Sequence, residues 1–393
     1  MIDKIKKLSI ESLEDVIRIR RHIHKFPELS FQEKETSAYI QTELKNIGIP
    51  FTNGHVKTGI IGTIEGKNPK GKTILLRADI DALPIVEKNN VSYKSSNEGV
   101  MHACGHDAHT ASLIGAAKIL NSLRDEFTGT IKILFQPAEE KLPGGAKLLI
   151  EDGVFESIQP NVCLAQHVFP ELPAGKVGFK KGLYMASTDE LHVTVHGKGG
   201  HAALPHKVID PVVIAAQLII NLQQIISRNN NPITPSVLSF GYIEGKGATN
   251  VIPNEVKIKG TFRTFDENWR DEAHEKMLQM ANSIATSMGG SCDFEIKNGY
   301  PFLTNDFEIT DLAIEAAKEF LGEENVVDLD LRMTSEDFAY LSHEFPSCFY
   351  RLGTNDGKNN SNLHTPTFNI DEKSLEIGAG LLAYIAIKQL DKL

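Results

Sequence analysis

Two short stretches of this 393-residue chain concentrate side chains that bind metals and transfer protons. Residues 102–107 read His-Ala-Cys-Gly-His-Asp, and residues 136–145 read Gln-Pro-Ala-Glu-Glu-Lys-Leu-Pro-Gly-Gly. Thiolate, imidazole and carboxylate groups are ligands of borderline-soft divalent metals, and a carboxylate beside metal-bound water can take its proton. The two stretches together indicate a metal-dependent hydrolase.

Cys104 and His106 are the first candidate ligands. They are two residues apart, so in an extended or turned segment both can face one ion, and Gly105 between them permits a close approach. A core cysteine beside a capping histidine is the alternative for an isolated pair. Three histidines and an aspartate within eight residues favour the metal site.

Glu139 and Glu140 follow a strand-like run and a proline, which predicts a position at the carboxyl end of a strand. One carboxylate can bind a metal while the other takes a proton from water and returns it to a leaving amine. The alternative is a solvated pair near a helix N-terminus. The neighbouring cysteine motif favours the catalytic interpretation.

Three further histidines are weaker candidates when each is taken alone. His167 follows an apolar strand-like run, and His364 lies in a polar loop before Thr365 and Pro366. His201 follows a glycine-rich turn, where a mobile or partner-supplied group could meet the substrate. A satisfied or capping histidine is the alternative in each case.

The composition is that of a globular protein, with 41% hydrophobic residues, 23% charged residues and a formal net charge of −10. The chain contains no apolar run of bilayer length and no basic stretch suited to a phosphate backbone, so neither a membrane nor a nucleic acid is an expected partner. The first nine residues lack the apolar core of a secretory signal, and the four dispersed cysteines suit reduced thiols. These features predict a cytoplasmic protein.

The pattern of apolar residues predicts an α/β fold. Helices are expected at 13–24, 33–47 and 109–123, and strands at 59–64, 73–79 and 130–135. The run at 73–79 is apolar enough to be a buried parallel strand. The strand ends would then carry the chemistry.

The sequence pattern changes near residue 186 to strands and long helices of an α+β unit. We therefore predict an inserted domain at 186–296 within a discontinuous catalytic domain formed by 1–185 and 297–393. If the strand at 191–195 is an exposed edge, it favours a homodimer, but it could equally be buried internally.

Eight blocks in order resemble the peptidase M20 amidohydrolases, in the branch that includes hydrolases of N-acyl amino acids, hippurate and indoleacetyl amino acids and deacetylases of N-acetyldiaminopimelate. The resemblance covers nearly the whole chain. The blocks are residues 21–30, 76–84, 102–107, 136–140, 197–203, 250–253, 335–338 and 364–366.

The resemblance implies a two-metal, zinc-peptidase-like catalytic domain with an inserted lid or dimerisation domain. Carried over by position, Glu139 becomes the general base and acid, and His201 the histidine that polarises the scissile carbonyl, within its own chain or across a dimer. Asn250 and Arg263 would hold substrate oxygen atoms, although Arg263 could instead sit in a structural ion pair. The implied metal ligands are Cys104, His106, Glu140, His167 and His364.

The same resemblance implies residues that orient the ligands. Ala78 and Asp79 stand where the wider superfamily supplies a metal histidine, so Asp79 and Asp81 are expected to support the ligands rather than replace them. Asp107 and Glu336 would also orient ligands, or cap helices.

The implied activity is hydrolysis of an N-acyl L-amino acid to a free amino acid and a carboxylic acid. It would use two divalent ions, chosen among manganese, zinc, nickel and cobalt by availability. A metallo-dipeptidase or carboxypeptidase with the same site is one alternative, and a catalytically silent metal-binding scaffold is another. The family resemblance also favours a homodimer.

Overall fold

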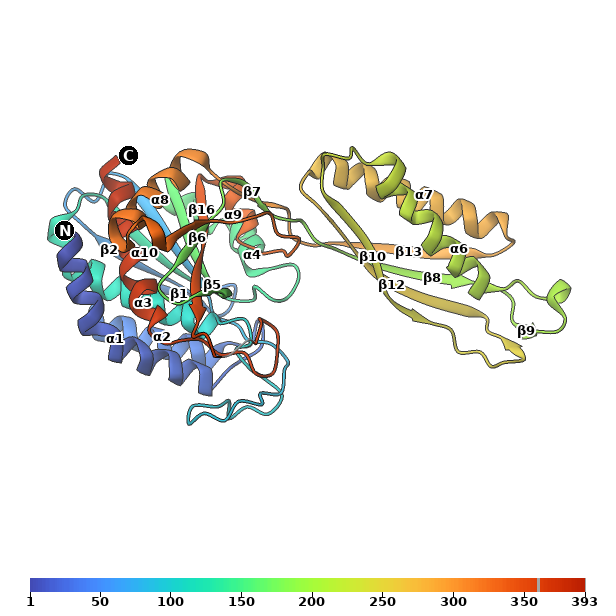
Figure 1. Cartoon of the computed structure of the whole chain (residues 1–393), viewed down its shortest axis with the longest axis horizontal. Helices are drawn as coiled ribbons and strands as arrows, with labels where there is room; N and C mark the ends of the chain where they lie inside the picture. Colours follow the sequence, from blue (N-terminus) through green and yellow to red (C-terminus); the bar gives the residue numbers. More distant parts are fainter. Residues whose placement is uncertain (359–360, 393) are drawn as a thin grey trace. The chain divides into compact units, whose positions relative to one another are not determined.

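The computed structural model describes residues 1–358 and 361–392. Contacts between Cα atoms divide the chain into two compact units (Figure 1). Unit 1 comprises Met1–Tyr184, Thr304–Asp330 and Asp337–Leu393, and unit 2 comprises Met185–Leu303 and Leu331–Glu336. The chain therefore leaves unit 1 twice.

The second excursion, at residues 331–336, is absent from the domain limits expected from the sequence. It joins unit 2 because the backbone N–H of Ala186 donates to the carbonyl oxygens of Arg332, at 3.0 Å, and Thr334, at 3.1 Å. Unit 2 also continues to Leu303 rather than ending at residue 296. Pairings between segments about 150 residues apart leave no local pattern in the sequence.

Unit 1 contains an eight-stranded sheet with the strand order β1-β2-β4-β3-β5-β16-β6-β15. Strand β3 runs parallel to β4 and β5 on its two sides, which confirms the predicted buried parallel strand. The strands are β1 (Phe51–His55), β2 (Gly59–Glu65), β3 (Thr73–Asp79), β4 (Thr130–Gln136), β5 (Val162–Pro173), β6 (Val177–Phe179), β15 (Val326–Asp328) and β16 (Ser347–Asn355). The α/β class is confirmed.

Eight α-helices are found among the described residues of unit 1. They are α1 (Ile2–Lys25), α2 (Lys34–Ile47), α3 (His106–Ser122), α4 (Gly145–Glu151), α5 (Val154–Ile158), α8 (Phe307–Leu321), α9 (Ala339–Glu344) and α10 (Ser374–Lys392). Helices α1, α3 and α10 pack against one another, with Ile19, Ala116 and Leu382 in their shared core.

Helix α1 begins eleven residues before the predicted start at residue 13. Ser9 and Ser12 interrupt the apolar stripe in the sequence, yet both are buried. Their hydroxyl groups donate to the carbonyl oxygens of Ile5 and Ser9 within the helix, at 2.9 and 3.1 Å. Because these bonds satisfy the hydroxyls, the buried face continues through two polar residues.

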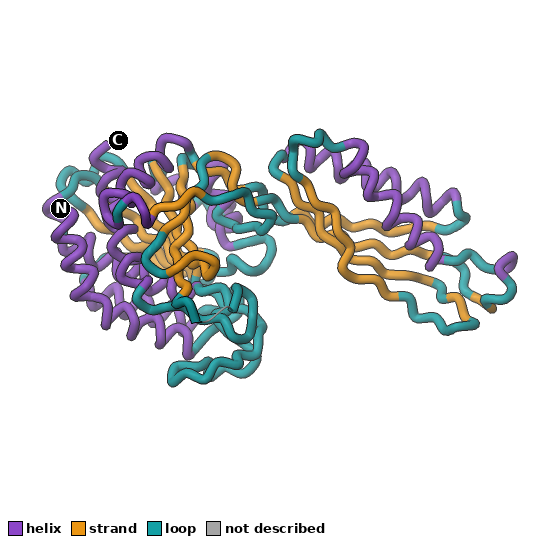
Figure 2. The backbone as a smooth tube through the Cα atoms, viewed as in Figure 1, coloured by secondary structure: helices purple, strands orange, loops and turns teal. Residues whose placement is uncertain are grey.

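Unit 2 contains a four-stranded antiparallel sheet, ordered β10-β12-β8-β13, and two long helices that lie on one face of it (Figures 1 and 2). The elements are β8 (Asp189–His196), α6 (Pro211–Gln224), β10 (Ser236–Glu244), β12 (Glu255–Thr264), α7 (Glu267–Ser287) and β13 (Ser291–Asn298). A separate two-stranded sheet pairs β9 (Gly200–His201) with β11 (Val251–Ile252). The chain enters unit 2 through β7 (Gly182–Met185) and leaves it through β14 (Leu303–Asn305).

The strand at 191–195 is not an edge strand. It lies within β8, which pairs with β12 on one side and β13 on the other. The edges of this sheet are β10 and β13. Of the two alternatives, the internal position is the one found, so residues 191–195 give no argument for a dimer.

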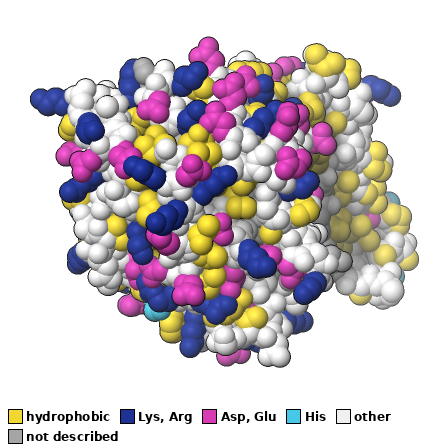
Figure 3. Space-filling model, turned by 60° about the vertical axis from the view of Figure 1, so that its left-hand side comes forward, with side chains coloured by type: hydrophobic (Ala, Val, Ile, Leu, Met, Phe, Trp, Pro, Cys, Tyr) yellow, Lys and Arg dark blue, Asp and Glu magenta, His cyan; other side chains and the backbone are white. Residues whose placement is uncertain are grey.

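All four cysteines are free thiols, with Cys163 and Cys348 buried in the core as expected. On the face drawn in Figure 3, basic and acidic side chains are interspersed rather than segregated by sign. Among the described residues, no helix combines the length and the apolar character that crossing a membrane requires.

Candidate metal centre

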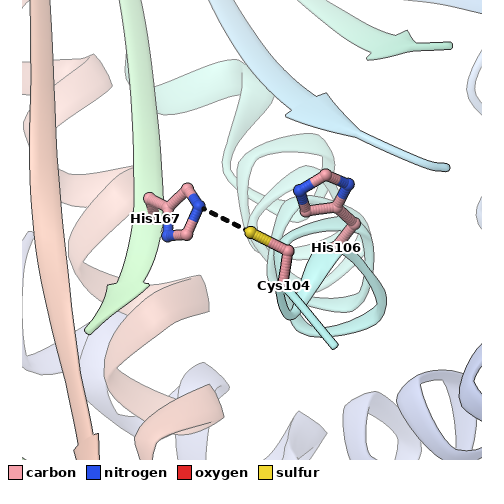
Figure 4. A group of neighbouring side chains, drawn as sticks. All are labelled: Cys104, His106 and His167. Atoms are coloured by element: carbon pink, nitrogen blue, oxygen red, sulfur yellow. Dashed lines mark hydrogen bonds between the residues drawn. The ribbon is translucent and has the colours of Figure 1, made fainter. Parts of the chain in front are cut away.

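Three of the predicted ligands meet where helix α3 begins beside strand β5. Cys104 lies just before α3, His106 is its first residue, and His167 lies on β5. The Cys104 sulfur points toward His167, with 3.4 Å between Sγ and Nε2 (Figure 4). Gly105 has φ +85°, and a Cβ there would lie 2.4 Å from a Val168 methyl, so glycine is required for this turn.

The predicted carboxylates and the last histidine complete the group. His364 Nε2 lies 3.3 Å from Glu140 Oε1 and 3.4 Å from Cys104 Sγ. His106 Nε2 lies 3.9 Å from Oε2 of Glu139 and 3.9 Å from Oε1 of Glu140. Unit 1 thus brings together six predicted side chains: Cys104, His106, Glu139, Glu140, His167 and His364.

Hydrogen bonds on the far side of two imidazoles orient them toward this group. His106 Nδ1 lies 3.2 Å from Asp81 Oδ1, and His167 Nδ1 donates to the Val168 carbonyl oxygen at 2.7 Å. Each ring therefore presents its Nε2 lone pair to the group. Asp81 Oδ2 also accepts from the Glu140 backbone N–H at 3.0 Å, so one carboxylate orients two candidate ligands.

The donor set fits a divalent cation. His106 Nε2 is buried and forms no hydrogen bond, and Glu140 Oε1 is buried with the His364 imidazole as its neighbour at 3.3 Å. Leaving His106 Nε2 unsatisfied is unfavourable, and coordination of a cation would satisfy it. The groups Cys104, His106 and His167, and Cys104, Glu140 and His364, share the sulfur, so the arrangement can accommodate two neighbouring ions.

The electrostatics of the group favour positive charge. Burial alone would lower the pKa of His106, but the carboxylates of Asp79 and Asp81 raise it to about 10. Burial, reinforced by Glu140 and Glu139, raises the pKa of the Cys104 thiol well above its usual range. A cation would offset both effects because it stabilises the thiolate and replaces the imidazole proton.

A buried network behind the centre includes residues whose roles were not predicted from the sequence. Arg77 donates to Asp79 Oδ2 and Asp337 Oδ1, both at 2.7 Å, and to Gln136 Oε1 at 3.0 Å. Both Arg77 and Asp337 lie in recognised sequence blocks, but they are 260 positions apart. Nothing local in the sequence indicates that they pair.

Asp107 supports the centre from the other side. Its Oδ2 accepts from Arg20 Nε at 2.9 Å and lies 2.8 Å from His24 Nδ1. Although burial opposes the effect, Arg20 and His24 lower the pKa of Asp107 below its usual range. The carboxylate therefore ties α1 to the first turn of α3, beside His106.

The remaining predicted site residues belong to unit 2. His201 is exposed on β9, where its Nδ1 accepts from the Ala203 N–H at 3.1 Å. Asn250 is exposed just before β11, and its carbonyl oxygen accepts from the Ala202 N–H at 3.0 Å. The pairing of β9 with β11 thus brings His201 and Asn250 into neighbouring positions.

Arg263 lies on β12 and is partly buried. It donates to the carbonyl oxygen of Met333 at 3.0 Å and to Ser335 Oγ at 3.4 Å. Burial lowers the pKa of its guanidinium group. Both acceptors are neutral, so these bonds position the guanidinium, while the Asp189 carboxylate acts on its charge in the direction opposite to burial.

Comparison with known proteins places the chain in one family. The model of peptidase family M20/M25/M40 matches residues 75–388. The chain belongs to this family.

Three relatives illustrate its range. The N-acetyl-L-cysteine deacetylase of Bacillus subtilis is 42% identical over 98% of this chain and 90% of the relative. Thermostable carboxypeptidase 2 of Saccharolobus solfataricus is 37% identical over the full length of both chains. The crystal structure of a dinuclear metal-binding M20 peptidase from Bacillus subtilis superposes with a TM-score of 0.83 at 36% identity, covering 97% of this chain and 99% of that one.

Proposed function

We propose that the protein is a metal-dependent amidohydrolase that cleaves the amide bond of N-acyl L-amino acids. One observation carries the proposal: an acidic side chain, Glu139, lies beside a group of metal-binding donors that includes His106 Nε2, a buried atom without a hydrogen-bond partner. The relative that deacetylates N-acetyl-L-cysteine supports the substrate class.

The ligands we assign are Cys104, His106, Glu140, His167 and His364, with two divalent cations. When bound, the cations polarise the scissile carbonyl and lower the pKa of water. The related dinuclear peptidase supports the number of ions. We propose manganese or zinc, because the donor set combines sulfur, nitrogen and oxygen.

Glu139 acts as general base and then general acid. Its side chain is largely buried and lies 3.9 Å from His106 Nε2, at the edge of the donor group. From there it can take a proton from the attacking water and give it to the departing amine nitrogen. The tetrahedral species then collapses to a carboxylic acid and a free amino acid.

Unit 2 supplies the proposed contacts to substrate. The exposed imidazole of His201 would donate to the developing oxyanion, and Arg263 with Asn250 would hold the carboxylate of the amino acid. We propose that unit 2 is a lid and dimerisation domain.

Two features of unit 2 support a homodimer. Helix α6 exposes Val213 and Ile220, at 47% and 64% of their surface, and β10 is an edge strand. We also propose the cytoplasm as the location.

A metallocarboxypeptidase activity is the second candidate, favoured by the full-length similarity to thermostable carboxypeptidase 2. A single experiment separates the candidates: purified protein is stripped of metal, reloaded with manganese or zinc, and assayed on N-acetyl, N-benzoyl and N-indoleacetyl amino acids and on dipeptides. Faster release from the N-acyl substrates supports the proposal, and faster release from dipeptides supports the alternative. Absence of turnover despite bound metal would contradict both and favour a silent scaffold.

A further inference from the structure

The residue before Glu139 has an unusual backbone conformation. Ala138 is fully buried and has φ +56°, in the left-handed region that L-residues with a Cβ disfavour. Its conformation sets the direction in which the chain enters Glu139. The structure must therefore hold Ala138 in place.

Two hydrogen bonds hold the backbone of Ala138. Its N–H donates to Glu33 Oε1 at 3.0 Å, and its carbonyl oxygen accepts from the Gly145 N–H at 3.0 Å. A Cβ on Gly145 would lie 1.8 Å from the Pro137 carbonyl oxygen, so only glycine allows this close approach. Among these contacts, only the one to Glu33 comes from a side chain.

Glu33 is itself fixed from several directions. Its Oε1 also accepts from the Phe31 N–H at 2.8 Å, and its Oε2 accepts from Thr58 Oγ1 at 2.8 Å. The side chain is completely buried at the start of α2. Phe31 is also left-handed, with φ +67°, so one carboxylate oxygen joins two strained residues from segments about 100 positions apart.

We propose that Glu33 is a positioning residue that keeps Ala138 left-handed and thereby aims Glu139 at the reacting water. This inference depends on the role proposed above for Glu139. The neighbouring Glu140 has a separate support, the bond from its N–H to Asp81. Loss of the Glu33 contact should therefore disturb the base more than the metal ligand.

What Ala138 requires from Glu33 is an acceptor oxygen at the correct reach rather than a negative charge. In Glu33→Gln the amide oxygen can still accept from Phe31 and Ala138, and the Thr58 hydroxyl can rotate to accept from the amide NH₂. In Glu33→Asp the charge remains, but the side chain is one methylene too short to reach Ala138. Glu33→Gln therefore tests the loss of the charge at unchanged side-chain length, and Glu33→Asp tests the loss of length at unchanged charge.

The test measures kcat, KM and metal content for Glu33→Gln, Glu33→Asp and Glu33→Ala, with thermal unfolding as a check on folding. We expect Glu33→Gln to keep kcat within about threefold, and Glu33→Asp to lose at least about tenfold in kcat with metal content and KM little changed. Glu33→Asp keeps the test decisive if Glu33→Ala does not fold.

Rescue provides a readout that general destabilisation would not give. Glycine adopts positive φ without the steric penalty, so adding Ala138→Gly to Glu33→Asp should restore part of the lost kcat. Full activity in Glu33→Asp, or a larger loss in Glu33→Gln than in Glu33→Asp, would overturn the proposal. So would failure of Ala138→Gly to raise kcat.

The outcomes distinguish this inference from the proposed function. If wild-type protein loaded with metal hydrolyses no N-acyl amino acid, the proposed function fails. If wild type is active but Glu33→Asp matches it, the function stands and the positioning role is wrong.

Discussion

His109 Nδ1 lies 2.6 Å from Asp79 Oδ1, while its Nε2 accepts a hydrogen bond from the Val168 N–H at 2.9 Å. Because Nε2 accepts, the Nδ1 N–H is the group that donates to Asp79 Oδ1. Asp79 thus orients a histidine that supports β5 beside His167. The expectation that Asp79 supports the ligands agrees with this geometry.

Asp79→Asn should destabilise the metal-free protein, because it leaves Arg77 with one fewer anionic partner in a buried site. We expect the free energy of unfolding to fall by about 3 kcal/mol, the range for breaking a buried ion pair. Urea denaturation measures it. Asp15→Asn is the control, since Asp15 pairs with Arg18 at an exposed site and should cost less than about 1 kcal/mol. If the two variants lose the same free energy of unfolding, Asp79 does not stabilise the protein through a buried ion pair with Arg77.

Stability of the metal-free protein should depend on the ionisation of Glu33. Burial, reinforced by the Asp81 carboxylate, raises the pKa of Glu33 from 4.5 to about 7. Between these values the folded state binds more protons than the unfolded state, so the contribution of Glu33 to stability is largest at low pH and falls as pH rises. Urea titrations of wild type and Glu33→Gln from pH 5 to 8 should show wild type losing stability relative to the variant. If the difference in the free energy of unfolding between wild type and Glu33→Gln stays constant over this pH range, the pKa of Glu33 is not raised in the folded protein.

Cys104→Ala should reduce bound metal, because the sulfur belongs to both overlapping ligand groups. Elemental analysis after dialysis against metal should give markedly less than the wild-type stoichiometry. Cys292→Ala is the matched control, since Cys292 is a partly exposed thiol of unit 2 and should leave metal content unchanged. Wild-type metal content in Cys104→Ala would show that the sulfur is not a ligand.

His201→Ala should lower kcat by about a hundredfold, as expected for loss of an oxyanion donor, while bound metal stays at the wild-type level. His206→Ala offers a control in the same unit, since His206 is also an exposed histidine outside the assigned site. Steady-state kinetics with an N-acetyl amino acid makes the comparison. If both variants keep full kcat, His201 has no role in stabilising the transition state.

Much of unit 1 could be predicted from the sequence because its signals are local. The apolar run of β3 and the clustered donors around Cys104 each lie within a few residues. The roles of Arg77 and Glu33 could not be predicted, because their partners Asp337 and Ala138 lie more than 100 positions away. Alanine also carries no sequence signal for a left-handed conformation. Likewise, the local alternation of β8 did not reveal that strands pair on both of its sides.

The most direct test of the account is hydrolysis of an N-acetyl amino acid by metal-loaded Glu139→Gln, with metal content measured on the same sample. The substitution keeps the shape of the side chain but removes its ability to take a proton. We predict that turnover falls by at least about a thousandfold while metal stays at the wild-type level. Turnover near that of wild type would contradict the role of Glu139 as the base, and loss of metal together with activity would make it a ligand instead.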